Sequence, residues 1–172
     1  MNPWKPVSVG KAAGIAAALA AIAGLRQSSP DHWVRILDDA NLVFHEAGHP
    51  LFGLLGPTLG LYGGTLGQLV FPAATSIHFF RQGETASFGL CFAWLFENFL
   101  NIGRYMADAR AQVLPLIGGG EHDWTTIFSR WGVLAYDVKI GDCVQGLGWL
   151  GILGCAVWLL VGASASRFRT FA

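Results

Sequence analysis

Residues 41–80 constrain the fold of this chain more than any other stretch, because they contain no Asp, Lys or Arg and only one acid, Glu46. A run of this length is enough for one long membrane span or for two shorter ones. Gly56 and Pro57 fall near its middle, where such residues mark a turn. We therefore expect two apolar helices, 41–57 and 63–80, joined by a tight turn.

The composition of the whole chain also indicates a membrane protein. Of its 172 residues, 53% are hydrophobic and 13% are charged, whereas a soluble domain has about 25% charged residues. The mean hydropathy is +0.46, and further apolar runs lie at 8–25, 85–107 and 143–163. The sequence predicts an all-α, polytopic membrane helical bundle with about four to five transmembrane helices and two interfacial helices. We expect residues 1–172 to form a single integral membrane domain.

The expected setting is a lipid bilayer, specifically the bacterial inner (cytoplasmic) membrane. The formal net charge is zero, and no basic patch stands out, which argues against nucleic acid as a partner. The run 8–25 favours a retained first helix, although a cleaved signal peptide has the same pattern. Amphipathic patterns at 31–40 and 124–134 predict the two interfacial helices. Lys and Arg divide almost evenly between the two sides, so the positive-inside rule leaves the orientation open.

The sequence His45-Glu46-Ala47-Gly48-His49 carries the chemistry of the uncharged stretch. In a helix, positions i and i+4 lie on one face, so His45 and His49 can offer two imidazoles to one Zn²⁺. Glu46 lies beside the first ligand, where a carboxylate can accept a proton from an activated water. The same groups are also able to hydrogen-bond to one another within the bundle, but the motif's mechanism favours metal binding.

A catalytic zinc needs a third protein ligand, and Asp108 and His122 are the two candidates. Asp108 belongs to a polar stripe on one helical face. Polar groups in a membrane helix usually face the interior of a bundle or a functional site. The members of this stripe are Asn98, Asn101, Tyr105, Asp108 and Gln112. A salt bridge from Asp108 to Arg104 or Arg110 is the alternative interpretation.

His122 follows the glycines 118–120, which would allow it to fold back over the site. Its neighbours Glu121 and Asp123 would orient its second ring nitrogen, and imidazole is a common zinc ligand. These features favour His122 slightly over Asp108. The alternative interpretations of His122 are an exposed loop residue and a helix cap, and Asp123 is also a candidate cap for the helix that follows.

The stretch Phe44-His45-Glu46-Ala47-Gly48-His49, followed by the glycine-rich stretch from Gly63 to Gln68, resembles membrane-embedded zinc metallopeptidases of the site-2 protease type. The resemblance covers residues 40–72. It implies that His45 and His49 are zinc ligands and that Glu46 is the catalytic base. In that family the third ligand is an Asp in an Asp-Gly motif on a later apolar helix. This chain contains no Asp-Gly, so the third ligand stays open between His122 and Asp108.

These observations predict a zinc-dependent metallopeptidase that hydrolyses peptide bonds in membrane or juxtamembrane segments. Its partners would be the bilayer and a membrane-protein or peptide substrate. The face formed by Gly63, Gly64 and Gly67 would let another helix, or a substrate backbone, approach closely. The rival interpretation is a non-proteolytic membrane protein with a structural metal site or a partner-binding scaffold role.

Overall fold

The computed structural model describes residues 4–117 and 121–169, with side chains described through residue 164. Within these residues the secondary structure is helical and contains no strand, which confirms the all-α prediction. The glycines 118–120 lie outside the described residues. The elements are α1 (Val9–Ser28), α2 (Leu37–Gly53), α3 (Pro57–Gln82), α4 (Thr85–Ala107), α5 (Asp123–Trp131), the 3₁₀ turn η1 (Leu134–Tyr136) and α6 (Asp137–Arg169).

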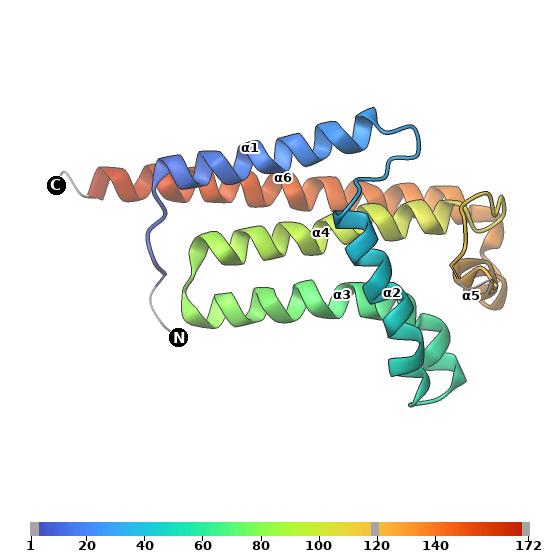
Figure 1. Ribbon diagram of the computed structural model, residues 1–172. Coiled ribbons are helices and arrows are strands. Elements are labelled where there is room, and N and C mark those ends of the chain that lie inside the picture. The colour runs from blue at the N-terminus through green and yellow to red at the C-terminus, as the bar shows by residue number, and fades with distance from the viewer. Residues whose placement is uncertain (1–3, 118–120, 170–172) are drawn as a thin grey trace.

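The long helices form a bundle, and α2 is inclined to it. In Figure 1, α1, α6, α4 and much of α3 run side by side, whereas α2 is steeply inclined to this row and packs along the N-terminal half of α3. α4 is central, because it packs against both α3 and α6. α3 and α4 form a helical hairpin whose turn is at Gly83, in the left-handed conformation that a glycine adopts without strain (φ 69°). The short α5 lies at one end of the bundle.

Glycines allow α2 and α3 to touch through their backbones. A Cβ atom added to Gly48 would overlap the backbone of Gly63, and one added to Gly67 would overlap the carbonyl oxygen of Phe44. The glycine face of α3 is therefore covered by another helix, which confirms that part of the prediction. The alternative, in which a substrate backbone docks on this face, is wrong because α2 already occupies it.

The start of α2 differs from the prediction of an interfacial helix at 31–40. The chain turns through residues 30–36 and becomes helical only at Leu37. Asp38 accepts a hydrogen bond from the backbone N–H of Val34, and Asp39 accepts one from Ile36 at 3.4 Å. These side chains satisfy the backbone in a turn, which competes with a helix. The second predicted interfacial helix corresponds to α5.

The turn between the two predicted apolar helices is present, but its position differs. α2 ends at Gly53 and α3 begins at Pro57, not at residue 63. Proline suits the first turn of a helix, because its fixed φ is helical and its missing N–H would have no partner there. Gly56, with φ of 122°, makes the turn itself. The prediction of residues 85–107 matches α4.

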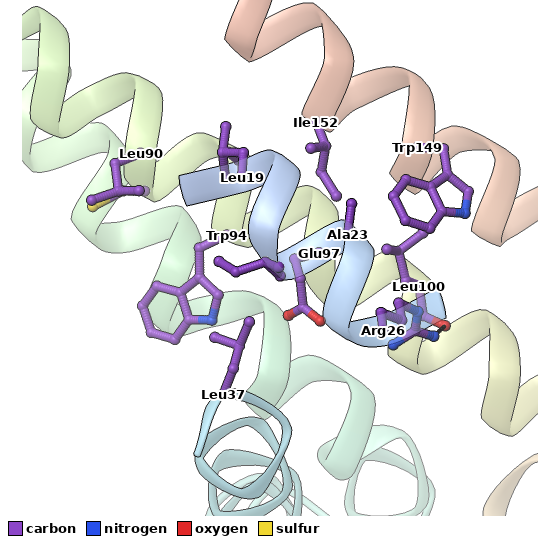
Figure 2. Close-up of a pocket in the computed structure, with 13 residues that line it drawn as sticks. Leu19, Ala23, Arg26, Leu37, Leu90, Trp94, Glu97, Leu100, Trp149 and Ile152 are labelled. Atoms are coloured by element: carbon purple, nitrogen blue, oxygen red, sulfur yellow. Dashed lines mark hydrogen bonds between the residues drawn. The ribbon is translucent and has the colours of Figure 1, made fainter. Parts of the chain in front are cut away.

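Charged and amide side chains lie inside the bundle and connect α1, α2 and α4. Glu97 of α4 accepts a hydrogen bond from Asn41 at 2.7 Å, Asn101 donates to Asp38, and Arg26 donates to the carbonyl oxygen of Leu100 at 3.1 Å. An otherwise apolar cavity of about 280 Å³ adjoins Arg26 and Glu97 (Figure 2). This cluster fixes the N-terminal end of α2 against α4.

Two helical stretches of the described chain, Val9–Ser28 and Leu134–Ser164, are long and apolar enough to cross a membrane. The larger number of spans that the sequence predicts is not confirmed. α2 has only 17 residues, which is short for a span. In α3 and α4, glycines and polar side chains dilute the apolar residues.

Replacing Gly48 by Ala should destabilise the protein, because the added methyl group would force α2 away from Gly63. We expect a loss of about 1–3 kcal/mol in the free energy of unfolding, as is typical for overpacking. Thermal unfolding of the detergent-purified chain measures the loss. Gly146→Ala in α6 is the matched control, since its added Cβ meets nothing within 4 Å. Equal melting temperatures for the two variants would contradict the proposed role of this helix contact.

Candidate metal centre

Three potential metal ligands from two helices converge beside α3. His45 and His49 lie on one face of α2, as their spacing predicts, and Asp123 is the first residue of α5. The Asp123 Oδ2 atom is 3.0 Å from Nε2 of His45 and 3.3 Å from Nε2 of His49. One ligand atom from each residue lies within 4.8 Å of the others, so the group is able to hold a metal ion.

The outer hydrogen bonds of the two histidines determine which ring nitrogen faces the group. His45 Nδ1 is 3.0 Å from Oε1 of Gln68, and His49 Nδ1 is 2.9 Å from the carbonyl oxygen of Gly60. Both partners accept hydrogen bonds, so each Nδ1 carries a proton and each Nε2 faces Asp123. Either a metal ion bound by these atoms or protons on the two Nε2 atoms would balance the charge of the Asp123 carboxylate.

The spacing of the three ligand atoms is compatible with a small tetrahedral metal ion such as zinc. Two ligands of one tetrahedral zinc lie about 3.3 Å apart, since each metal–ligand bond is about 2.0 Å long. The two contacts of Asp123 are close to that value. Gly64 of α3 faces both rings, and a Cβ atom there would collide with His45 and lie 2.7 Å from Nε2 of His49. The absence of a side chain at Gly64 thus allows both rings to pack directly against α3.

α5 positions Asp123 through its N-terminal turn. The backbone N–H of Asp123 donates to the hydroxyl of Tyr105 at 3.2 Å, which ties the start of α5 to α4. The preceding residue, His122, caps the helix because its Nδ1 accepts from the N–H of Thr125 at 3.3 Å. Burial alone would raise the pKa of the Asp123 carboxyl, but the contacts with His45 and His49 hold that pKa below its usual range.

The structure does not bring His122 and Asp108, the two candidates from the sequence, into this group. They face each other, with His122 Nε2 at 3.5 Å from Oδ2 of Asp108. Asp108 also accepts hydrogen bonds of 3.0 Å from the N–H groups of Val113 and Leu114. Burial lowers the pKa of His122 below its ordinary value, although Asp108 acts in the opposite direction. His122 therefore acts as a neutral cap.

The residue that sequence reasoning missed, Asp123, is the direct neighbour of the favoured candidate. The cluster Glu121-His122-Asp123 is recognisable in the sequence as a possible source of a metal ligand. His122 is favoured within it because imidazole is a common zinc ligand. A one-residue difference at a helix start changes which side chain points toward α2. The acidic residue at the first helical position was the available signal, because the resemblance implies an Asp as the third ligand.

Glu46 and His45 line a second cavity, of about 410 Å³. The rest of its wall comes from the loop before α2, from α2, α3 and α4, and from the segment 113–117, whose exposed apolar side chains include Val113 and Ile117. The cavity therefore places a carboxylate and one of the proposed ligands on a space large enough for part of a peptide.

Every member of the predicted polar stripe has a specific partner near this region. Asn98 accepts from Gln68 at 3.4 Å, and Gln112, beyond the end of α4, donates to Thr125 at 3.2 Å. Asn101, Tyr105 and Asp108 make the contacts described above. Because Gln68 also binds His45, the stripe supports the orientation of the first histidine.

No protein-family model, curated protein or solved structure matches this chain. The chemistry assigned to the site therefore rests on its geometry.

Replacing Asp123 by Ala should weaken metal binding, with zinc as the probe, because it deletes one of the three converging ligand atoms. We expect zinc affinity to fall by more than the roughly 10–100-fold loss that is typical when an outer hydrogen-bond partner is removed. Metal analysis of the purified protein and competition with a fluorescent zinc chelator measure the loss. Asp108→Asn is the matched control and should keep its zinc. Zinc loss in Asp108→Asn alone would contradict the assignment of Asp123.

Proposed function

We propose that this protein is a zinc-dependent, membrane-embedded metallopeptidase that hydrolyses peptide bonds in membrane or juxtamembrane segments. One observation carries the proposal: the Nε2 atoms of His45 and His49 face the carboxylate of Asp123, while Glu46 lines the cavity beside them. Three protein ligands with an adjacent carboxylate are the composition of a catalytic zinc site, which leaves one position for water.

The distribution of polar and apolar side chains supports the membrane setting. Inside the bundle, Asp38 and Asn98 are fully buried. On the outside, large apolar side chains are exposed, such as Leu54 (84% exposed) and Leu150 (68%). A chain in water rarely has this pattern, whereas a bilayer favours it, because lipid covers apolar surface and penalises exposed polar groups. The two stretches that are long and apolar enough to span agree with it.

The residues around the cavity supply the steps of hydrolysis. A zinc ion held by His45, His49 and Asp123 would provide Lewis-acid activation of water. Glu46 would take one proton from the water as the water oxygen attacks the peptide carbonyl carbon. Glu46 would then give that proton to the leaving amine, so that one carboxylate acts first as base and then as acid.

Tyr105 is placed to stabilise the charge that develops on the carbonyl oxygen. Its hydroxyl oxygen accepts the N–H of Asp123, so the hydroxyl proton is free to point elsewhere. Tyr105 lines the same cavity as Glu46, and its ring is edge-on to His45 with centroids 5.6 Å apart. A donor fixed in this way would bind the oxyanion better than the uncharged carbonyl.

Replacing Glu46 by Gln should preserve bound zinc and abolish hydrolysis, because the amide cannot accept the proton. We expect the rate to fall by at least about 10²–10⁴-fold, the usual contribution of a general base. Mass spectrometry of membrane peptides compares cells that express the wild type or the variant, with zinc content measured in parallel. Glu121→Gln is the control. Unchanged membrane peptides together with full zinc would favour the structural or scaffold role instead.

Replacing Tyr105 by Phe should slow hydrolysis about 10²–10³-fold, as the loss of one oxyanion donor typically does. Zinc content should not change, since Tyr105 contributes no ligand atom to the group. Tyr62→Phe is the control, because that hydroxyl accepts only an exposed bond from Trp131. An unchanged rate would exclude the donor role. Loss of zinc would show instead that Tyr105 serves to position Asp123.

A further inference from the structure

Arg104 is a cation in the wall of the cavity that Glu46 and His45 also line. It lies in the last turn of α4, and its guanidinium carbon is 5.5 Å from the centroid of the Trp33 ring. Among residues 4–117 and 121–164, no carboxylate oxygen lies within 4.0 Å of its nitrogens, and its guanidinium makes no hydrogen bond. This part of the chain therefore leaves the hydrogen-bond donors of Arg104 unused.

Three other cations of the described residues have partners. Arg110 pairs with Asp137 at 2.7 Å, and the buried Arg26 donates from Nη2 to the carbonyl oxygen of Leu100, although its Nη1 has no partner. Lys5 pairs with Glu84 at the hairpin turn. A half-buried arginine without such a partner is costly to maintain. Arg104 therefore differs from these cations in being both desolvated and uncommitted.

The carboxylates closest to Arg104 have partners of their own. Asp31, Asp38 and Asp108 are near enough to act on it electrostatically. Each of these carboxylates accepts two hydrogen bonds from other groups. The donors are Ser29 and the N–H of Trp33 for Asp31, the N–H of Val34 and the side chain of Asn101 for Asp38, and the N–H groups of Val113 and Leu114 for Asp108. None of the three forms an ion pair with Arg104, so its charge is available to a ligand.

The position of Arg104 over the Trp33 ring limits which of its groups can meet a ligand. A guanidinium packed over an aromatic ring uses its face, which leaves the N–H groups along its edge free. A carboxylate matches that edge with two parallel hydrogen bonds, and the match is strongest where water is excluded. The neighbouring wall contains Leu42 and the apolar segment 113–117. The cavity thus combines a carboxylate-binding group with an apolar lining.

We propose that Arg104 binds a carboxylate of the peptide substrate, next to apolar substrate residues. The carboxylate is either the free C-terminus of the peptide or the side chain of an Asp or Glu close to the cleaved bond. This inference rests on the proposed peptidase function for its biological meaning. Binding of a carboxylate, however, is measurable whether or not the bound peptide is cleaved.

The test uses three apolar synthetic peptides of one sequence and the zinc-loaded full chain in detergent. The first peptide has a free C-terminal carboxylate, the second a C-terminal amide, and the third a C-terminal amide with one internal Gln replaced by Glu. Fluorescence polarisation measures their binding to Glu46→Gln protein, and mass spectrometry measures their cleavage by wild-type protein. We expect at least one carboxylate peptide to bind about 10–100-fold more tightly than the neutral amide, as a charged hydrogen-bond pair provides.

The same measurements are made with Arg104→Gln, Arg104→Lys and the control Arg35→Gln, each in the Glu46→Gln background, with helicity checked by circular dichroism. The preference should disappear in Arg104→Gln, be reduced in Arg104→Lys, and persist in Arg35→Gln. A preference for the first peptide alone identifies the C-terminus as the source, and one for the third alone identifies an acidic side chain.

Equal binding of all three peptides, no binding at all, or a preference that survives in folded Arg104→Gln would overturn the inference. Carboxylate-dependent binding without cleavage by the wild type would count against the peptidase function while leaving the role of Arg104 intact. The two proposals therefore fail separately.

Discussion

The backbone contact between α2 and α3 is the constraint on which the rest of the structure depends. Gly48 packs on Gly63, and Gly67 packs on the carbonyl of Phe44, so the two helices approach more closely than side chains would permit. This approach brings Gln68 to His45 and the carbonyl of Gly60 to His49. The histidines are thereby oriented by α3, although both belong to α2. Gly64, in the same row, has no side chain and so lets both histidine rings pack against α3.

α4 completes the arrangement from the opposite side. Its polar face makes hydrogen bonds to α2, to α3 and to the start of α5, and each of these bonds compensates a group that would otherwise be buried without a partner. Through Tyr105 it places Asp123 of α5 against the two histidines of α2. The site therefore combines two candidate ligands set by local helix spacing with a third candidate whose position depends on tertiary packing.

This division explains how much the sequence could predict. The all-α fold, the extent of α4 and the pairing of His45 with His49 follow from local periodicity and helical geometry. The identity of the third residue does not, because it depends on which side chain at the start of α5 faces α2. The frequency of imidazole as a zinc ligand favoured His122. That imidazole instead serves as a helix cap, and the neighbouring Asp123 contacts His45. Similarly, residues 31–36 have a helical pattern but form a turn, because Asp38 and Asp39 bind the backbone there.

X-ray absorption at the zinc edge of the zinc-loaded full chain tests most directly whether these residues form one open metal site. The account predicts a four-coordinate ion with nitrogen and oxygen ligands at about 2.0 Å and the outer scattering of two imidazole rings. A sulfur ligand at about 2.3 Å would instead implicate the cysteines. A shell of six oxygens without imidazole scattering would show that the ion binds elsewhere. Either result would contradict the site formed by His45, His49 and Asp123.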